Sequence, residues 1–190
     1  DSTKQSRFSY EPAWMLKMEL LTKLAYAALS AGSSYVLDGA TAQEIIISHL
    51  ELLEEHHLLP RGLSYDQVVV SLAAIGFVQI AGSNIRFWHH AFVEYFALPE
   101  LADRLVTIPD YLDSIIDKPQ WENALPLAVP QASSPGDLLR LVLERNVFIA
   151  ARTALEWDQV EPEIVGSIAA ALASKCGSST RPIRQITLRL

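Results

Sequence analysis

Cysteine is nearly absent from this chain of 190 residues, which contains only Cys176. A lone cysteine cannot form a disulfide within the chain or build a zinc site from several thiolates. No apolar run reaches the length of a membrane span, and the first residues, DSTKQSR, lack the apolar core of a signal peptide. We therefore expect a cytoplasmic protein with no membrane contact.

Positive charge is also scarce. The chain has 15 Lys and Arg residues against 22 Asp and Glu residues, which gives a net charge of −7. Sequence-independent binding to nucleic acid or to an anionic membrane needs a basic surface, so this balance argues against both kinds of partner. Half of the residues are hydrophobic, which is enough to bury the core of one large domain or two small ones.

Catalytic motifs are missing as well. The sequence has neither the Gly-x-Ser-x-Gly turn of many hydrolases nor the Gly-x-x-x-x-Gly-Lys-Ser/Thr loop that binds nucleotide phosphates. Two histidine pairs remain, His56–His57 and His89–His90. Neighbouring histidines on a strand point to opposite faces, and no carboxylate or cysteine completes a ligand set at useful spacing. We expect no catalytic and no metal-binding residue, so the chain alone is not an enzyme.

Helical spacing of apolar residues dominates the first 76 residues. Gly32 ends the first periodic segment and Gly76 ends the third. Thr41 with Glu44 has the pattern of a capping box at the start of the second, and Ser64 is placed to cap the third. The expected helices cover 11–31, 41–57 and 65–75.

Two short β-type runs follow, FVQIA and IRFWH, separated by Gly-Ser-Asn. This pattern predicts a hairpin. Three helices followed by a hairpin is the order of a winged-helix domain, which we place at 1–98. A further helix is expected to begin near His90, and Pro99 should end or kink it.

The remainder of the chain reads as a linker and helical repeats. Residues 99–134 are rich in proline and contain Trp121, so we expect a loose joint there. Helical spacing returns in 135–190, with short helices separated by tight breaks and a further helix beginning after Pro182. Because one or two helix pairs cannot bury a continuous core, we expect this chain to be a piece of a longer repeat protein. The fold class is therefore mostly α.

The third expected helix, YDQVVVSLAAI, contains Asp66 and no Lys or Arg. Recognition helices of DNA-binding proteins carry side chains that reach phosphates and base edges. This helix therefore argues against a nucleic-acid partner.

The stretch IRFWHHAFVEYFAL contains the strongest functional signal. Phe92, Tyr95 and Phe96 recur at helical spacing, so we expect them in the core, and Glu94 should be exposed or hydrogen-bonded. His89 falls where the second hairpin strand meets the next helix. A side chain at such a junction can project from the domain toward a neighbour.

Residues 86–98, RFWHHAFVEYFAL, resemble the signature that closes the winged-helix domain of NACHT-type STAND NTPases. Upstream and downstream segments are also similar to that family, over about residues 14–156, including HEAT-like helical repeats after the signature. The sequence departs from the signature at Leu98, where the family has alanine, and at Pro99. The matching residues are Phe87, His89, Phe92, Glu94, Tyr95, Phe96 and Ala97.

The resemblance implies a regulatory fragment of a signalling NTPase, such as those used in defence. In that family the histidine at the position of His89 contacts the β-phosphate of ADP held by an upstream NTPase domain. ADP, ATP and Mg²⁺ then belong to the parent protein, while this segment holds no cofactor. The repeats would detect an unknown trigger, and the parent would form a homo-oligomer on activation.

Two other interpretations stay open. The chain could be a helical-repeat scaffold in which His89 has no nucleotide contact, or a winged-helix transcription regulator. The acidic balance and the third helix, which has no basic residue, speak against the second of these.

Overall fold

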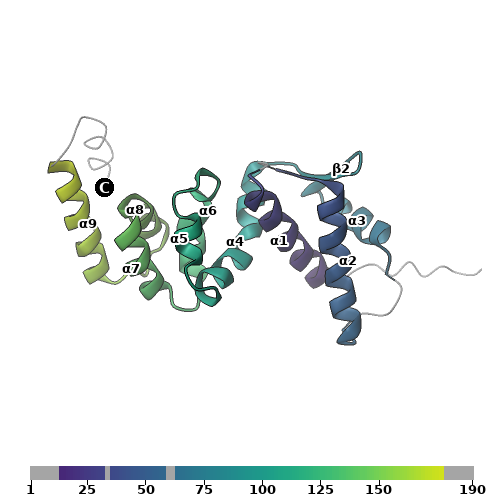
Figure 1. Cartoon of the computed structure of the whole chain (residues 1–190), viewed down its shortest axis with the longest axis horizontal. Coiled ribbons are helices and arrows are strands. Elements are labelled where there is room, and N and C mark those ends of the chain that lie inside the picture. Colours follow the sequence, from purple (N-terminus) through teal and green to yellow (C-terminus); the bar gives the residue numbers. More distant parts are fainter. Residues whose placement is uncertain (1–12, 33–34, 59–62, 178–190) are drawn as a thin grey trace, which may run out of the picture. The chain divides into compact units, whose positions relative to one another are not determined.

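The computed structural model describes residues 13–32, 35–58 and 63–177. The described chain is mostly helical with one small antiparallel sheet of three strands, which confirms the expected fold class in outline (Figure 1). It divides into two compact units, residues 1–97 and 98–190. The helix expected after Pro182 lies outside the described residues.

The first unit places its helices against the small sheet. Its elements are α1 (Trp14–Ser30), β1 (Val36–Leu37), α2 (Gly39–Glu55), α3 (Tyr65–Ala74), β2 (Val78–Ala81), β3 (Asn84–Phe87) and the start of α4 (His90–Thr107). The hairpin of β2 and β3 is confirmed, and its tight turn uses Gly82 at a positive φ of 67°. The strand order is β1-β3-β2, with β1 added to the outer side of β3. Apolar spacing had not predicted β1, because two residues are too few to show alternation.

The observed helix starts in the first unit agree only in part with the starts predicted from the sequence. Ser64 caps α3 as expected, and its side chain and that of Gln67 form a reciprocal capping box. The capping box expected at Thr41 is wrong, since α2 begins at Gly39 with Asp38 as its N-cap. The Asp38 carboxylate accepts a hydrogen bond from the Thr41 amide at 2.9 Å. Hydrogen bonds from the side chain and then from the amide of Thr41 lower the pKa of Asp38.

The core of the first unit lies between helices α1, α2 and α3 and the inner face of the sheet. The largest fully buried side chains of these helices and strands are Leu20, Leu21, Leu24, Leu29, Leu37, Ile46, Leu72, Ile85 and Phe87. Because Ile85 and Phe87 alternate with exposed Arg86 on β3, one face of the central strand is apolar and the other polar. Arg86 therefore lies on the outward face of β3, three residues before His89.

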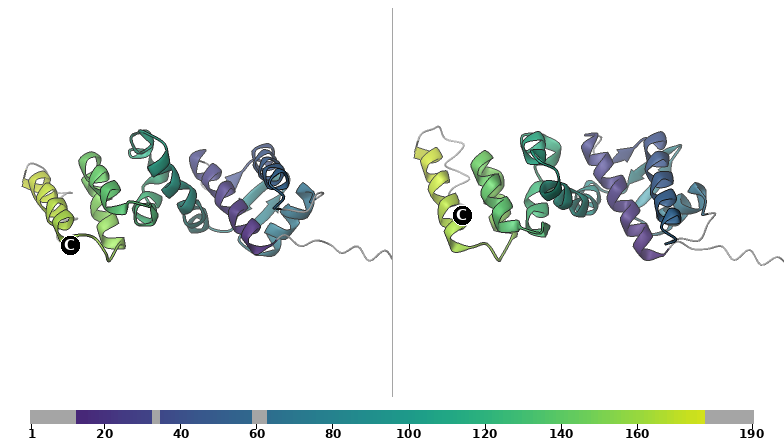
Figure 2. Two further views of the ribbon diagram at one scale, coloured as in Figure 1. Left: turned by 90° about the horizontal axis from the view of Figure 1, so that it is seen from below. Right: turned by 60° about the horizontal axis from the view of Figure 1, so that its bottom comes forward.

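The second unit consists of short helices and the end of α4. Its further elements are α5 (Tyr111–Ile115), η1 (Pro119–Trp121), α6 (Ala124–Ala128), η2 (Val129–Gln131), α7 (Pro135–Arg145), α8 (Val147–Glu156) and α9 (Pro162–Gly177). The expected loose joint at 99–134 therefore contains several helical segments, and Trp121 is only 2% exposed. Figure 2 shows α7, α8 and α9 as successive helices, and α8 packs against both neighbours.

Pro99 does not end α4, so that part of the expectation is wrong, while a kink at Pro99 stays a prediction. The helix continues through Pro99 to Thr107. A proline inside a helix removes one backbone hydrogen bond at a cost of about 3 kcal/mol. Burial of Leu98, Leu101 and Leu105 around it offsets this loss, since each buried leucine contributes roughly 1.5–3 kcal/mol.

Candidate functional site

The candidate site lies where β3 passes into α4. The buried Phe87 ends the strand, and its amide donates to the carbonyl of Tyr35 at 2.8 Å. The next amide, that of Trp88, donates to the carbonyl of Phe77 at 3.0 Å. The backbone is thus held on both sides immediately before His89. The carbonyl of His89 then accepts the amide of Phe92 at 3.0 Å, which begins the first turn of α4.

His89 is exposed, and one nitrogen of its ring is occupied. Nδ1 accepts a hydrogen bond from the backbone amide of Ala91 at 3.1 Å. A ring nitrogen that accepts from an amide carries no hydrogen, so the neutral imidazole carries its hydrogen on Nε2. Nε2 has no partner among the residues that the structure describes. The site therefore presents an oriented N–H donor to an acceptor from outside.

The aromatic residues of the motif divide between core and surface. Phe92 and Phe96 both meet Phe77 edge to face, with ring centroids 5.1 and 5.0 Å apart, and Phe96 is buried. Ala97 is fully buried, as a residue on the inner side of α4 should be. Tyr95 is 65% exposed, so its expected place in the core is wrong. Tyr95 lies four residues after exposed Ala91 on α4, and therefore on the outer side of the helix.

Glu94 and His90 engage each other instead of sharing the site with His89. His90 Nδ1 lies 3.3 Å from Glu94 Oε1, an i,i+4 pair along α4. The Glu94 side chain is only 13% exposed, so of its two expected states the exposed one is not observed. The adjacent histidines therefore differ: His90 has a carboxylate on its own helix, and His89 has the Ala91 amide.

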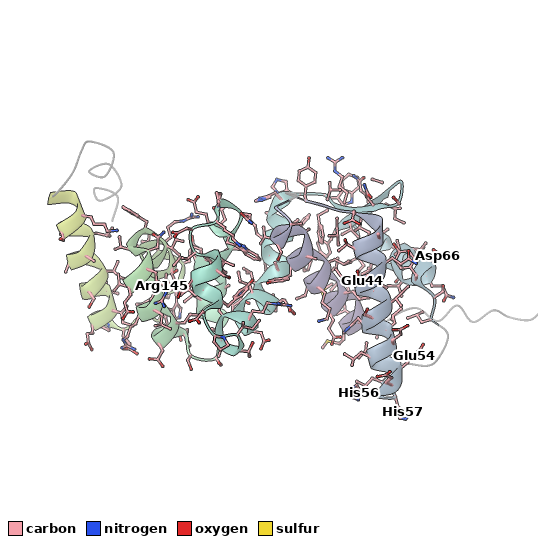
Figure 3. The ribbon with its side chains drawn as sticks, in the orientation of Figure 1. Glu44, Glu54, His56, His57, Asp66 and Arg145 are labelled. Carbon is pink, nitrogen blue, oxygen red and sulfur yellow. The ribbon has the colours of Figure 1, made fainter. Side chains whose placement is uncertain are left out.

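The two histidine pairs do not come together. His56 and His57 lie at the C-terminal end of α2 (Figure 3). The N-terminal end of that helix touches the hairpin, because the amide of Gly39 donates to Asn84 Oδ1 at 3.2 Å. A helix of 17 residues separates these ends by about 25 Å. Within the described chain no group of three or more His, Cys, Asp or Glu residues could hold a metal ion.

The outer side of α3 carries no cation. Its exposed residues are Asp66, Gln67, Val70 and Ala74, while Val68 and Leu72 face the core. Burial and the neighbouring Asp66 raise the pKa of Tyr65, so the Tyr65 phenol stays neutral and adds no charge to α3. Helix α3 therefore lacks the positive side chains that a DNA-recognition helix uses.

Sequence reasoning missed Arg86 and Tyr35 as neighbours. The Arg86 guanidinium carbon lies 4.9 Å from the centroid of the Tyr35 ring, and Nη2 donates to the Tyr35 hydroxyl at 3.4 Å. Trp88, two residues further along the strand direction, is 59% exposed. Successive side chains of a strand point to opposite faces, so Arg86 and Trp88 lie on the face opposite to buried Ile85. Tyr35 could not be foreseen because β1 was not predicted.

Comparison of the chain with protein-family models, with curated proteins and with solved structures finds no match. Among the described residues no helix is both long and apolar enough to cross a membrane. An argument about function therefore rests on the site itself.

Proposed function

We propose that this chain is a regulatory and sensor segment of a NACHT-type STAND signalling NTPase, in which His89 reports the nucleotide held by an upstream domain of the same protein. The observation that carries the proposal is the exposed His89 ring, whose Nδ1 is engaged and whose Nε2 is available as a donor. Phosphate oxygens of ADP are strong acceptors for such a donor.

The order of elements supports a winged-helix domain as the carrier of His89. Helix α1, strand β1, helices α2 and α3 and the hairpin follow one another as in that fold. The outer side of α3, which carries Asp66 and no cation, favours a role in protein switching over DNA recognition. In this proposal the hairpin serves to position His89 at the edge of the domain, facing the nucleotide.

The second unit supports the proposed sensor role, the binding of a trigger by helical repeats. We assign α7, α8 and α9 to HEAT-like repeats that bind an unknown trigger, because consecutive short helices pack against one another there. This segment performs no chemistry in the proposal. ATP hydrolysis, Mg²⁺ and oligomer formation on activation belong to the whole cytoplasmic parent protein.

The switch follows from the loss of one contact. In the ADP state His89 Nε2 donates to the β-phosphate and holds the regulatory segment against the NTPase domain. Exchange for ATP removes that hydrogen bond and allows a hinge motion. A hydrogen bond to a charged group contributes about 1.5–3 kcal/mol, which corresponds to about 10- to 150-fold in ADP release.

The test uses the full-length protein and three variants. His89→Ala should accelerate ADP release by about 10- to 150-fold, and His89→Gln should fall between it and wild type because the glutamine amide still donates. His90→Ala is the matched control, since His90 pairs with Glu94, and should release ADP at the wild-type rate. Release is followed with a fluorescent ADP analogue. Equal release from wild type and His89→Ala would refute the proposal.

A helical-repeat scaffold is the second candidate. Leu141, Leu155 and Val165, on α7, α8 and α9, are large apolar side chains that remain exposed, as residues that bind a protein partner often are. In a scaffold His89 makes no nucleotide contact, so the same release experiment separates the two candidates.

A further inference from the structure

Arg86 differs from every other arginine in the described chain. The others each bind a carboxylate: Arg104 binds Glu100, Arg140 binds Asp137 and Glu161, Arg145 binds Asp113, and Arg152 binds Glu122. Arg86 has no carboxylate partner among the described residues, although the chain is strongly acidic. Its guanidinium is exposed and rests on the Tyr35 ring.

The position of Arg86 brings it close to His89. Arg86 lies on β3, the central strand, paired across to Val36 on one side and to Gln79 on the other. Three residues of extended chain span at most about 10 Å, so the backbone positions of Arg86 and His89 lie within that distance. The Tyr35 ring that holds the guanidinium belongs to the residue whose carbonyl accepts the Phe87 amide, so the guanidinium is held beside the end of β3 that leads to His89. Both side chains are exposed.

Tyr35 orients the guanidinium before any ligand binds. Nη2 is used in the bond to the Tyr35 hydroxyl, and the ring supports the face of the group. The Nε–H and Nη1 donors of Arg86 have no partner within the described residues. A guanidinium fixed in this way loses less conformational freedom on binding an anion, and its planar donors match phosphate oxygens.

We infer that Arg86 is a second anion-binding residue of the His89 site and binds the β-phosphate of the nucleotide. This inference rests on the proposed function for the identity of the ligand. The same donors could instead bind a carboxylate of the upstream domain, since the shared chemistry is an anionic oxygen. Arg86 would then affect domain contact without sensing the phosphate chain.

The experiment compares ADP and AMP in the full-length protein. Arg86→Gln should weaken ADP binding by about ten- to a hundredfold and should change AMP binding much less, because AMP lacks the β-phosphate. Arg86→Lys should recover part of the loss, since it keeps the charge. Lys118→Gln, which removes one positive charge from another exposed position, should leave both affinities unchanged.

The outcomes separate the two claims. If His89→Ala accelerates ADP release while Arg86→Gln leaves ADP affinity unchanged, the inference is overturned and the proposed function stands. An equal loss of ADP and AMP affinity in Arg86→Gln would also overturn it, in favour of a carboxylate contact. If neither variant alters nucleotide binding, both claims fail. Thermal melting of Arg86→Gln, expected at the wild-type temperature, shows that the variant is folded.

Discussion

At the scale of single residues, the state of the His89 ring depends on its hydrogen-bond partner. The motif alone places a histidine at a junction, whereas the Ala91 amide determines which ring nitrogen can donate outward. The exposed Tyr95 shows the limit of spacing as a guide. Phe77, which precedes β2, fills the inner side of α4 together with Phe92 and Phe96, and a one-dimensional pattern could not reveal that packing.

The pair of Arg145 and Asp113 makes the stability of the second unit depend on pH. Arg145 donates to both carboxylate oxygens of Asp113, and its hydrogen bonds hold the pKa of Asp113 below the ordinary value of 3.8. A carboxyl group whose pKa is lower in the folded state stabilises the fold at any pH above its pKa in the unfolded chain. That contribution is lost as the pH falls through the pKa of the folded state.

Asp113→Asn should therefore lower the melting temperature at pH 7, and the difference from wild type should shrink as the pH is lowered below 3.8. Thermal melting followed by circular dichroism across this range measures the effect. Asp117→Asn removes the same charge at another exposed position and serves as the control. A deficit in Asp113→Asn that is constant with pH would show that the ion pair is not its cause.

At the scale of elements, helices were easier to predict than their ends. The N-cap at Ser64 was predicted correctly because Ser64 and the helix start that it caps are local in sequence, whereas the reciprocal bond from Gln67 was not predicted. The start of α2 was misplaced because Asp38 competes with Thr41 as a cap. Pro99 was given too much weight, since burial of the residues around it maintains α4.

Gly39 lies at a close contact between α2 and the hairpin turn, which the sequence alone does not reveal. A Cβ at this position would lie 2.3 Å from the Ser83 carbonyl oxygen, so the first turn of α2 touches the backbone of the hairpin turn. Gly39→Ala should destabilise the first unit by about 1–3 kcal/mol, the usual cost of overpacking. Urea unfolding measures this change.

Gly166→Ala in α9 is the control for that substitution, because nothing lies within 4 Å of its Cβ position. Alanine in a helix interior is favoured over glycine by about 0.8–1 kcal/mol, so this variant should be more stable than wild type. If both variants shift stability in the same direction, the close approach at Gly39 is not responsible.

At the scale of the whole molecule, the spacing of apolar residues predicted the fold class in outline and left the partner open. The described chain is mostly helical with a small sheet, as the apolar spacing indicated. The absence of cations on the outer side of α3 agrees with the net charge of −7 in arguing against DNA as a ligand. The exposed apolar residues of the second unit are scattered over several helices, so no local pattern in the sequence identifies a partner.

The chain should accordingly show no binding to duplex DNA even at low ionic strength, where any electrostatic attraction is strongest. Fluorescence anisotropy of a short labelled duplex measures this directly. Salt-sensitive binding would support a transcription regulator instead.

The central claim is that this chain works beside an NTPase domain of the same protein, and the sequence encoded upstream of Asp1 tests it most directly. The account predicts a Gly-x-x-x-x-Gly-Lys-Ser/Thr loop followed by an Asp-rich strand within a few hundred codons. A coding region that reads through into Asp1 without such a loop would contradict it, and would leave His89 as a surface residue of a helical scaffold.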